Sequence, residues 1–570
     1  MNTTATTTAR GAARSARPTL KTLLLASGMA FFWVLNSPLS VCANVYATDI
    51  RILGSTPGSA TTATVFVPCD NAVLISYRLN EPADAGVIVE IHSETTTVRA
   101  FAKAPGNPGA LRGENTLVWD LRNAQGEIVP FGFYTVHVRA AANGYANWTQ
   151  ISEDINAGNY VFQPRGIAVN RNPSSPYYGR VYVANGQAGF NPDSEPGDRF
   201  GIQMLNADGS RPADGGFSSG GWFLSETNSR PWKIEVADDD YVYISDWFDR
   251  GLVLRFDQNV SSASRISVLR SDNRPGAANL SGPFITGTGT NTQVWMADTN
   301  DGGAGIRRWT VSDDGTIAPN DTGTTIVEAG TNSHLSVAPY DVALDVSNRI
   351  FTIQFRNTNG DPAHRVMCFP PYDGSVGALT NSDWQIGSSD DNMGGAAGIA
   401  VDPTSTYVAV AFAGIGDGFG RIGGGVRVFD ATNGAGVQTF TPAPFHDHTD
   451  VAWDDVGNLY LCDNWDSLWR VYSPPGANTN TTIAPQTLEV GPPPLSPYLQ
   501  AAGYTNGQFQ FTLCGRTNVD YVIVATTNVL AGLQTWTPVL TNNESSPIRL
   551  ISVNAPPGRG FFCAYTTAVP

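Results

Sequence analysis

Along the chain, apolar and polar positions alternate over short runs, which is the period of a β-strand with one buried face. VLISYRL at 73–79 and VIVEIHS at 87–93 are two such runs, and FYTVHV at 133–138 is a third. The 59 Gly and 37 Pro among 570 residues suit tight turns between many short strands. Long amphipathic patterns rich in Ala, Glu, Lys and Leu are missing. The pattern therefore predicts an all-β protein with few helices.

Three strand-like runs recur together six times between residues 164 and 473, at intervals of about 50 to 70 residues. The second unit, for example, contains PWKIEVA (231–237), YVYISD (241–246) and LVLRFD (252–257). The units begin with PRGIAVN at 164, PWKIEVA at 231, GPFITG at 282, PYDVALD at 339, AAGIAVD at 396 and HTDVAWD at 448. Because one unit cannot bury its own faces, we expect the six to stack around an axis. This predicts a six-bladed β-propeller over residues 150–480.

The recurring pattern P-x-G-I-A-V-D, then G-x-V-Y-V-A-D, then R-V-x-x-F-D, resembles that of NHL-type propellers and of the gluconolactonase group. The resemblance supports the fold because it recurs in all six units, and it says little about activity. The stretch NWTQISED at 147–154 could supply a strand that closes the ring.

A different pattern precedes the propeller. Its positions are Trp119, Asp120, Gly126, Val129, Gly132 and Tyr134. This set resembles the immunoglobulin-like domain of the flagellar hook-capping protein, which recurs in exported bacterial proteins. The resemblance implies an immunoglobulin-like sandwich over 48–142 that carries no catalytic residues.

The end of the chain reads as a Pro- and Thr-rich linker at 481–500, followed by short strands over 501–570. The recurring elements there are Tyr521, Thr527, Asn528, Trp536, Arg559, Phe561 and Phe562. They resemble a small β-sandwich module at the C-terminus of many secreted proteins from environmental bacteria. The resemblance implies an attachment or spacer role.

The N-terminus reads as an export signal over 1–43, with a basic region that ends at Lys21 and the apolar run LLLASGMAFFWVL at 23–35. Its removal takes away four basic and no acidic residues, so the net charge of −16 becomes −20. We expect an extracellular, cell-surface or periplasmic protein without a membrane span, and no nucleic-acid partner. Lipid anchoring at Cys42 is not expected, because Val41 stands where a small residue is required.

None of the six cysteines forms a C-x-x-C pair, which excludes a zinc ribbon. Export makes disulfides possible. Cys514 and Cys563, in the first and last strand-like runs of the C-terminal segment, are the best candidate pair. The others, Cys42, Cys69, Cys368 and Cys462, are predicted to be buried thiols.

In a propeller, the starts of the first strands and the ends of the second strands meet at one channel mouth. The second-strand ends are Asn185, Asp246, Asp298, Gln354, Phe412 and Asp463. Resemblance to gluconolactonase-type enzymes implies a divalent metal there, and His446 and His448 lie nearby in sequence. Asp246, Asp298, Asp463 and the two histidines could hold Ca²⁺ or Zn²⁺. The repeated D-x-x-D/N spacing instead favours aspartates that cap the following turns.

Aromatic residues also gather near the expected mouth. Trp232, Phe284 and Tyr340 stand in the first strands, and Trp247 and Trp465 follow second strands. They could form the floor of a cleft for sugar or peptide, or they could pack between blades.

The leading hypothesis is an exported, non-enzymatic binding or surface protein whose channel mouth binds a glycan or another protein. One alternative is a metal-dependent propeller hydrolase or lyase of the gluconolactonase type. The other is a purely structural component of the cell envelope. No residue is assigned a catalytic role, and no cofactor other than the possible metal is expected.

Overall fold

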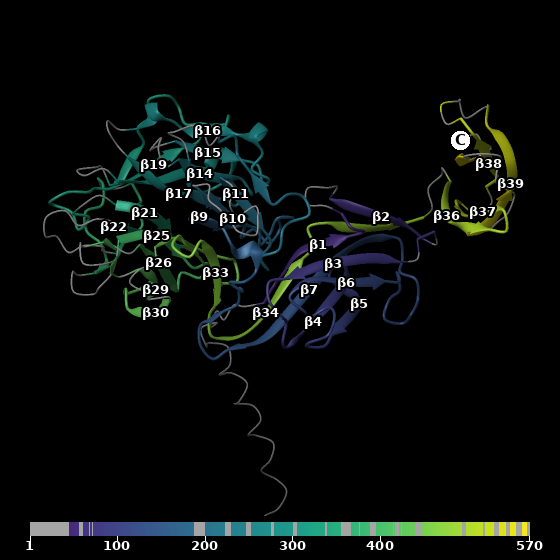
Figure 1. Ribbon diagram of the computed structural model, residues 1–570, viewed down its shortest axis with the longest axis horizontal. Coiled ribbons are helices and arrows are strands. Elements are labelled where there is room, and N and C mark those ends of the chain that lie inside the picture. The colour runs from purple at the N-terminus through teal and green to yellow at the C-terminus, as the bar shows by residue number, and fades with distance from the viewer. Residues whose placement is uncertain are drawn as a thin grey trace, which may run out of the picture. The chain divides into compact units, whose positions relative to one another are not determined.

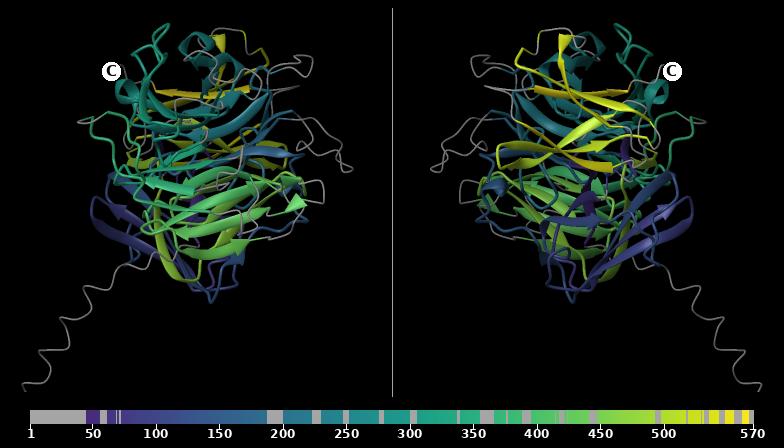
Figure 2. Two further views of the ribbon diagram at one scale, coloured as in Figure 1. Left: turned by 90° about the vertical axis from the view of Figure 1, so that its left-hand side faces the viewer. Right: turned by 90° about the vertical axis from the view of Figure 1, so that its right-hand side faces the viewer.

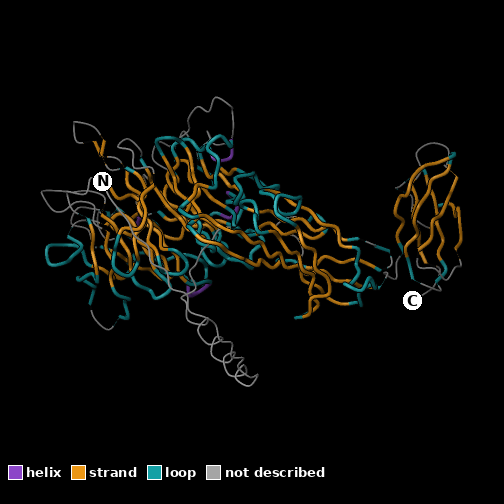
Figure 3. Tube along the Cα trace, turned by 90° about the horizontal axis from the view of Figure 1, so that it is seen from below, coloured by secondary structure: helices purple, strands orange, loops and turns teal. Residues whose placement is uncertain are grey.

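The computed structural model describes the chain from residue 45 onward. The described range has gaps at 56–60, 68, 71, 187–199, 223–229, 247–251, 275–278, 300–304, 337–338, 355–365, 375–376, 388–394, 414, 417–420, 423, 441–446, 493–496, 517–518, 529, 531–534, 543–547, 555–560 and 567–570. Regular structure within the described residues consists of strands and a few one-turn 3-10 helices (Figure 3). This confirms the prediction of an all-β fold.

Six four-stranded antiparallel sheets follow one another along the middle of the chain. Blade 1 contains β9 (Pro164–Val169), β10 (Val181–Asn185), β11 (Gly201–Leu205) and β12 (Phe217–Ser218). Blade 2 contains β13 (Pro231–Val236), β14 (Val242–Asp246), β15 (Val253–Phe256) and β16 (Ile266–Leu269). Blade 3 contains β17 (Leu280–Thr286), β18 (Gln293–Asp298), β19 (Ile306–Thr310) and β20 (Thr324–Val327).

The remaining blades repeat this plan. Blade 4 contains β21 (Pro339–Leu344), β22 (Ile350–Gln354), β23 (Val366–Phe369) and β24 (Trp384–Ile386). Blade 5 contains β25 (Gly395–Val401), β26 (Tyr407–Ala413), β29 (Gly425–Asp430) and β30 (Gly436–Phe440). Blade 6 contains β31 (His448–Trp453), β32 (Leu459–Asp463), β33 (Leu468–Ser473) and β8 (Thr149–Gln150). The green strands of blades 4 and 5 lie side by side as sheets in the left view of Figure 2.

The first strands of the six blades form a closed ring. Each of β9, β13, β17, β21, β25 and β31 contacts the first strand of the next blade, and β31 contacts β9. The second strands are buried along nearly their whole length, for example VYVAN in β10 and LYLCD in β32, because the neighbouring blades cover both faces. The molecule therefore contains a six-bladed β-propeller, as the repeats predict.

The ring is closed by a strand from before the first blade. Tyr472 and Ser473 of β33 pair with Gln150 and Thr149 of β8. The strand lies inside the stretch 147–154 that the sequence offers for this purpose. Trp148, next to it, packs edge-on against Phe440 and Trp453, with ring centroids 5.4 and 6.1 Å apart. Blade 6 thus joins residues from both ends of the propeller segment.

A two-layer β-sandwich precedes the propeller (Figure 1). One sheet contains β1 (Ala47–Ile52), β3 (Val73–Leu79) and β6 (Gly113–Trp119). The other contains β2 (Thr62–Phe66), β4 (Gly86–Ser93), β5 (Thr96–Lys103) and β7 (Gly132–Tyr145). Trp119 and Tyr134 meet edge-on in the shared core at 5.6 Å, as expected for core positions of the motif. The relation to the hook-capping type of domain stays a prediction.

The segment after the propeller corrects the predicted boundaries. Residues 476–491, partly assigned to a linker, form β34 (Gly476–Ile483) and β35 (Thr487–Gly491). Both strands pair with β7, and β35 also pairs in parallel with β2 (Figure 1). The linker prediction rested on the Pro and Thr content of the segment. The alternation in TLEVG at 487–491 is the better guide, because Leu488 and Val490 are buried and Glu489 faces outward.

The C-terminal module consists of two three-stranded sheets around a small core of its own. One sheet contains β36 (Tyr498–Thr505), β37 (Gln508–Cys514) and β40 (Ile548–Asn554). The other contains β38 (Tyr521–Thr526), β39 (Thr537–Asn542) and β41 (Phe561–Thr566). This agrees with the predicted small β-sandwich.

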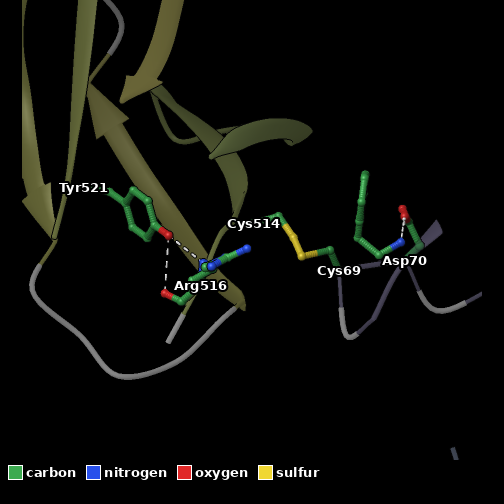
Figure 4. Close-up of a disulfide and its surroundings, with 6 residues drawn as sticks. Cys69, Asp70, Cys514, Arg516 and Tyr521 are labelled. Atoms are coloured by element: carbon green, nitrogen blue, oxygen red, sulfur yellow. Dashed lines mark hydrogen bonds between the residues drawn. A yellow bond between two sulfur atoms is a disulfide. The ribbon is translucent and has the colours of Figure 1, made fainter. Parts of the chain in front are cut away.

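The disulfide prediction was wrong in its partner. Cys514 is bonded to Cys69, with a Cα–Cα distance of 5.5 Å (Figure 4). Cys563 is a free thiol on β41, in the sheet opposite the one that carries Cys514. Cys368 and Cys462 are buried thiols as predicted, and Cys42 lies outside the described residues. A disulfide indicates an oxidising, extracytoplasmic environment.

Among the described residues, no helix is long and apolar enough to cross a membrane.

Candidate functional site in the propeller channel

One face of the propeller carries the starts of the first strands and the ends of the second strands, and we call it the mouth. Pro231 pairs with Asp246 there, Leu280 with Asp298, and His448 with Asp463. The same pairing joins Pro164 to Asn185 in blade 1 and Pro339 to Gln354 in blade 4. The strand ends predicted from the repeats are therefore at one face.

Asp246 and Asp298 have matching roles inside their own blades. Both side chains are buried. Asp246 accepts hydrogen bonds from the backbone N–H of Arg230 at 3.0 Å and from the indole N–H of Trp222 at 3.1 Å. Asp298 accepts one from the backbone N–H of Asn279 at 3.2 Å. Each carboxylate thus fixes the chain just before the first strand of its blade.

Asp463 has different partners. Its Oδ1 accepts the backbone N–H groups of Trp465 and Asp466, which is the predicted turn cap. Its Oδ2 pairs with the Arg470 guanidinium at 2.8 Å and lies 3.6 Å from Nε2 of the buried His448. Arg470 also pairs with Asp154, so this network ties blade 6 to the segment after the closing strand.

The metal hypothesis requires these groups to converge on one point. Within the described ranges, no group of three or more His, Cys, Asp or Glu side chains is placed to hold a metal ion. Asp246, Asp298 and Asp463 each have donors from their own blade. His446 lies outside the described residues, so the predicted Ca²⁺ or Zn²⁺ site stays a prediction.

The candidate aromatic residues do not share one environment. Trp232 is buried, and its indole N–H donates to Ser281 of the next blade at 3.3 Å. Tyr340 and Phe284 are partly buried against cores between blades. Trp465 is 55% exposed, and Trp247 lies outside the described residues. Trp232 therefore packs between blades. That Trp465 forms part of a cleft for sugar or peptide stays a prediction.

The channel behind the mouth holds a buried ion cluster. The Lys233 ammonium donates to Asp450 Oδ1 at 2.6 Å and to the carbonyl oxygen of Thr449 at 2.6 Å, and lies 3.5 Å from Asp341 Oδ2. Asp450 also accepts the backbone N–H of Ile167. All three charged side chains are at least nine-tenths buried. We call Lys233, Asp341 and Asp450 the channel cluster.

Burial sets the protonation of this cluster. It raises the pKa of Asp341 and that of Asp450, and Lys233 opposes the rise in both. The two carboxylates keep the pKa of Lys233 above its usual value. The cluster therefore favours a charged Lys233, and burial disfavours the charged form of both carboxyl groups.

The six first strands carry the cluster at one equivalent position. Those positions are Gly166, Lys233, Gly282, Asp341, Gly398 and Asp450, so glycine and charged residues alternate around the ring. A β-bulge adjoins this position in every first strand. The cluster is not predicted from the sequence, because a third unit that begins at Gly282 instead of Leu280 places Phe284 at the equivalent position and hides the alternation.

A small pocket opens beside the mouth between blades 1 and 2. It is lined by Arg165, Gly186, Arg230, Pro231 and Trp232. The Arg165 guanidinium lies over the Trp232 ring, 5.4 Å from its centroid. Burial lowers the pKa of Arg165, and the neighbouring positive charge of Arg230 lowers it further, whereas Tyr340 and Asp447 raise it. Two arginine residues thus line one pocket, and the guanidinium group of Arg165 is largely buried.

No protein-family model and no curated protein matches this chain. Among solved structures, a protein of unknown function from Bacteroides thetaiotaomicron is 13% identical, with 78% of this chain and 99% of that chain covered and a TM-score of 0.35. The streptogramin B lyase is 10% identical, with 60% and 100% covered and a TM-score of 0.32. The soluble aldose sugar dehydrogenase from Escherichia coli is 11% identical, with 60% and 99% covered and a TM-score of 0.35. These likenesses concern the β-propeller fold alone.

Proposed function

We propose that this chain is an exported binding protein whose propeller mouth holds an acidic glycan. The observation that supports the proposal is the pocket of Arg165 and Arg230 beside the mouth. Burial and the positive charge of Arg230 lower the pKa of Arg165, and Tyr340 and Asp447 oppose this effect. A carboxylate between the two arginines would offset the burial and the like charge, and arginine binds carboxylates through paired hydrogen bonds.

The net charge of the mature chain makes this pocket unusual. At −20 after removal of the leader, most of the surface repels anions. An acidic ligand that binds here therefore depends on the local arginines rather than on the overall field.

The metal-dependent hydrolase or lyase is less well supported by the geometry. That function needs carboxylates that converge on one ion, and Asp246, Asp298 and Asp463 are each held by donors inside their own blades. Elemental analysis of the mature chain distinguishes the two proposals. About one calcium or zinc ion per chain would favour the hydrolase.

The binding proposal is tested by calorimetric titration of the mature chain with uronic-acid oligosaccharides and with neutral oligosaccharides of the same length. We expect saturable binding of the acidic series. The double variant Arg165→Gln/Arg230→Gln should weaken it at least tenfold, since charged hydrogen bonds of this kind each contribute about 1.5–3 kcal/mol.

Arg308→Gln serves as the control, because Arg308 also lies over a tryptophan, Trp295, but in blade 3. The affinity of Arg308→Gln for the acidic oligosaccharides should match that of the wild-type chain. Equal binding of the neutral series, or full affinity in the double variant, would contradict the proposal.

A further inference from the structure

A second cavity lies on the side of the channel cluster that faces away from the mouth, and we call it the distal chamber. The channel cluster forms one end of it, and residues further along all six first strands line it. Its cavity volume is about 50 Å³. Space of this order admits only a ligand of a few non-hydrogen atoms, since a single water molecule needs about 10–15 Å³.

The composition of one layer explains the space. Two residues beyond the cluster position, the first strands carry Ala168, Glu235, Phe284, Ala343, Ala400 and Ala452. Side chains alternate along a strand, so this layer lies on the same strand face as the cluster, and its residues line the chamber, although Ala168 and Ala343 also pack into the cores between blades. Four of its members are alanines, which leave room in the middle. Glu235 and Phe284 are the larger side chains, and they stand on adjacent blades.

Glu235 lines this chamber, and within the described ranges its carboxyl group has only a distant basic partner. Burial raises its pKa to about 7, because water is partly excluded. Among the described residues its ion pair is with Arg171, whose Nη2 lies 3.8 Å from Glu235 Oε1. That distance is too long for a hydrogen bond. The carboxylate therefore has capacity for a further cationic partner.

Phe284 adds an aromatic wall to the same chamber. The ring is partly buried against the core between blades 3 and 4 and against the core between blades 4 and 5, and Phe284 lines the cavity. The face of an aromatic ring attracts cations within about 6 Å, most strongly where water is excluded. A carboxylate and an aromatic face within one layer form the combination that proteins use for organic ammonium groups.

The charges around the chamber agree with a cation. Asp341, Asp450 and Glu235 are acidic, and Lys233 and Arg171 are basic. Lys233 is already bound to Asp450 and to the Thr449 carbonyl. Arg171 is one-third exposed and pairs only loosely with Glu235. An incoming cation thus competes with Arg171 rather than with a tight internal ion pair.

We propose that the distal chamber binds a small organic ammonium compound, held by the Glu235 carboxylate and the Phe284 ring. A metal ion is a poorer match, because the described residues contain no group of three acidic, His or Cys side chains placed around one point. This site is separate from the proposed glycan site at the mouth.

The test is calorimetric titration of the mature chain with tetramethylammonium and with ethylammonium at pH 8, where Glu235 is ionised. We expect saturable binding of at least one of them. Glu235→Gln should lower the affinity at least tenfold, and Arg171→Gln should raise it several-fold by removing the competing cation. Binding should also weaken as the pH falls below about 7, as Glu235 takes up a proton.

Two controls keep the test specific. Asp314→Asn removes an exposed acid elsewhere in blade 3 and should leave affinity unchanged. Arg165→Gln/Arg230→Gln should also leave ammonium binding unchanged, so the failure of one site is separable from the failure of the other. Phe284→Leu, expected to lower affinity severalfold, replaces Glu235→Gln if that variant does not fold. Absence of saturable binding, full affinity in Glu235→Gln, or preference for a neutral polyol of the same size would overturn the proposal.

Discussion

At the scale of single residues, glycine and charge are interdependent in the propeller channel. A Cβ atom on Gly398 would lie 2.6 Å from Asp450 Oδ1 and 2.8 Å from Lys233 Nζ. A Cβ on Gly282 would overlap the carboxylate of Asp341. The glycines therefore make the space in which the channel cluster sits, and the cluster in turn fills the centre of the ring.

Substitution of Lys233 should be among the most damaging single changes in this propeller. Lys233→Met leaves two carboxylates buried without their cation, which costs about 3–5 kcal/mol. Chemical denaturation monitored by tryptophan fluorescence would measure the loss. The triple variant Lys233→Met/Asp341→Asn/Asp450→Asn should recover most of the stability, because it removes all three charges together. A triple variant as unstable as the single one would show that charge is not the cause.

At the scale of elements, strands from distant parts of the sequence complete both the propeller and the N-terminal sandwich. β8 comes before the first blade and completes the last, and β34 and β35 come after the last blade and complete the sandwich. The chain therefore leaves the sandwich, forms the propeller and returns. All strands of the propeller are present once residue 473 has been reached, whereas those of the sandwich are complete only at residue 491.

The returning strand gives a prediction about the N-terminal sandwich. Leu488→Ala, in β35, should destabilise it by about 2–5 kcal/mol, since Leu488 is fully buried in its core. Hydrogen exchange should then rise in β7 and β2, the strands that pair with β35. Glu489→Gln is the matched control, because the neighbouring side chain points outward to Thr64. Equal exchange in both variants would mean that the segment is a linker after all.

At the scale of the whole molecule, a disulfide bond joins distant segments, and buried carboxyl groups make stability depend on pH. The Cys69–Cys514 bond joins residues 445 positions apart, one beside the N-terminal sandwich and one in the C-terminal module. Several carboxyl groups are buried, and burial raises the pKa of Glu81 and of Asp454 to about 7. In the unfolded chain these groups have ordinary values near 4.

The protein should be more stable in mild acid than in mild base. Between about pH 4 and pH 7 the folded chain binds protons at Glu81 and Asp454 that the unfolded chain has lost. Their contribution to stability is therefore complete below about pH 4 and is lost as the pH rises to 7, at up to roughly 1.4 kcal/mol per pH unit for each proton. Thermal unfolding at pH 5.5 and pH 8 would measure it.

We expect a higher Tm at pH 5.5, and a smaller difference in Glu81→Gln, whose side chain can still accept the hydrogen bond from Tyr145. An equal or higher Tm at pH 8 would contradict the assignment of these groups as protonated in the folded state.

The sequence by itself determined the features that repeat or alternate locally. Strand runs such as QVWMAD (293–298) and LYLCD (459–463) coincide with β18 and β32, because burial on both faces demands apolar residues at consecutive positions. Six such units, none of which can bury its own faces, favour closure as a propeller. The Asp463 turn cap was likewise readable, since its partners lie two and three residues away.

Tertiary structure alone decided what depends on residues far apart in the chain. Cys514 is bonded to Cys69 rather than to Cys563, and β35 pairs with β7. Neither partner can be predicted from the local sequence pattern, because both depend on how distant segments meet in the folded chain. In the channel cluster, Lys233 comes from blade 2 and Asp450 from blade 6. The two residues are 217 positions apart in the sequence, and closure of the ring brings them together. The alternation of apolar and polar residues determines which face of a strand is buried. Which distant residue packs or bonds against that face is determined only by the folded tertiary structure.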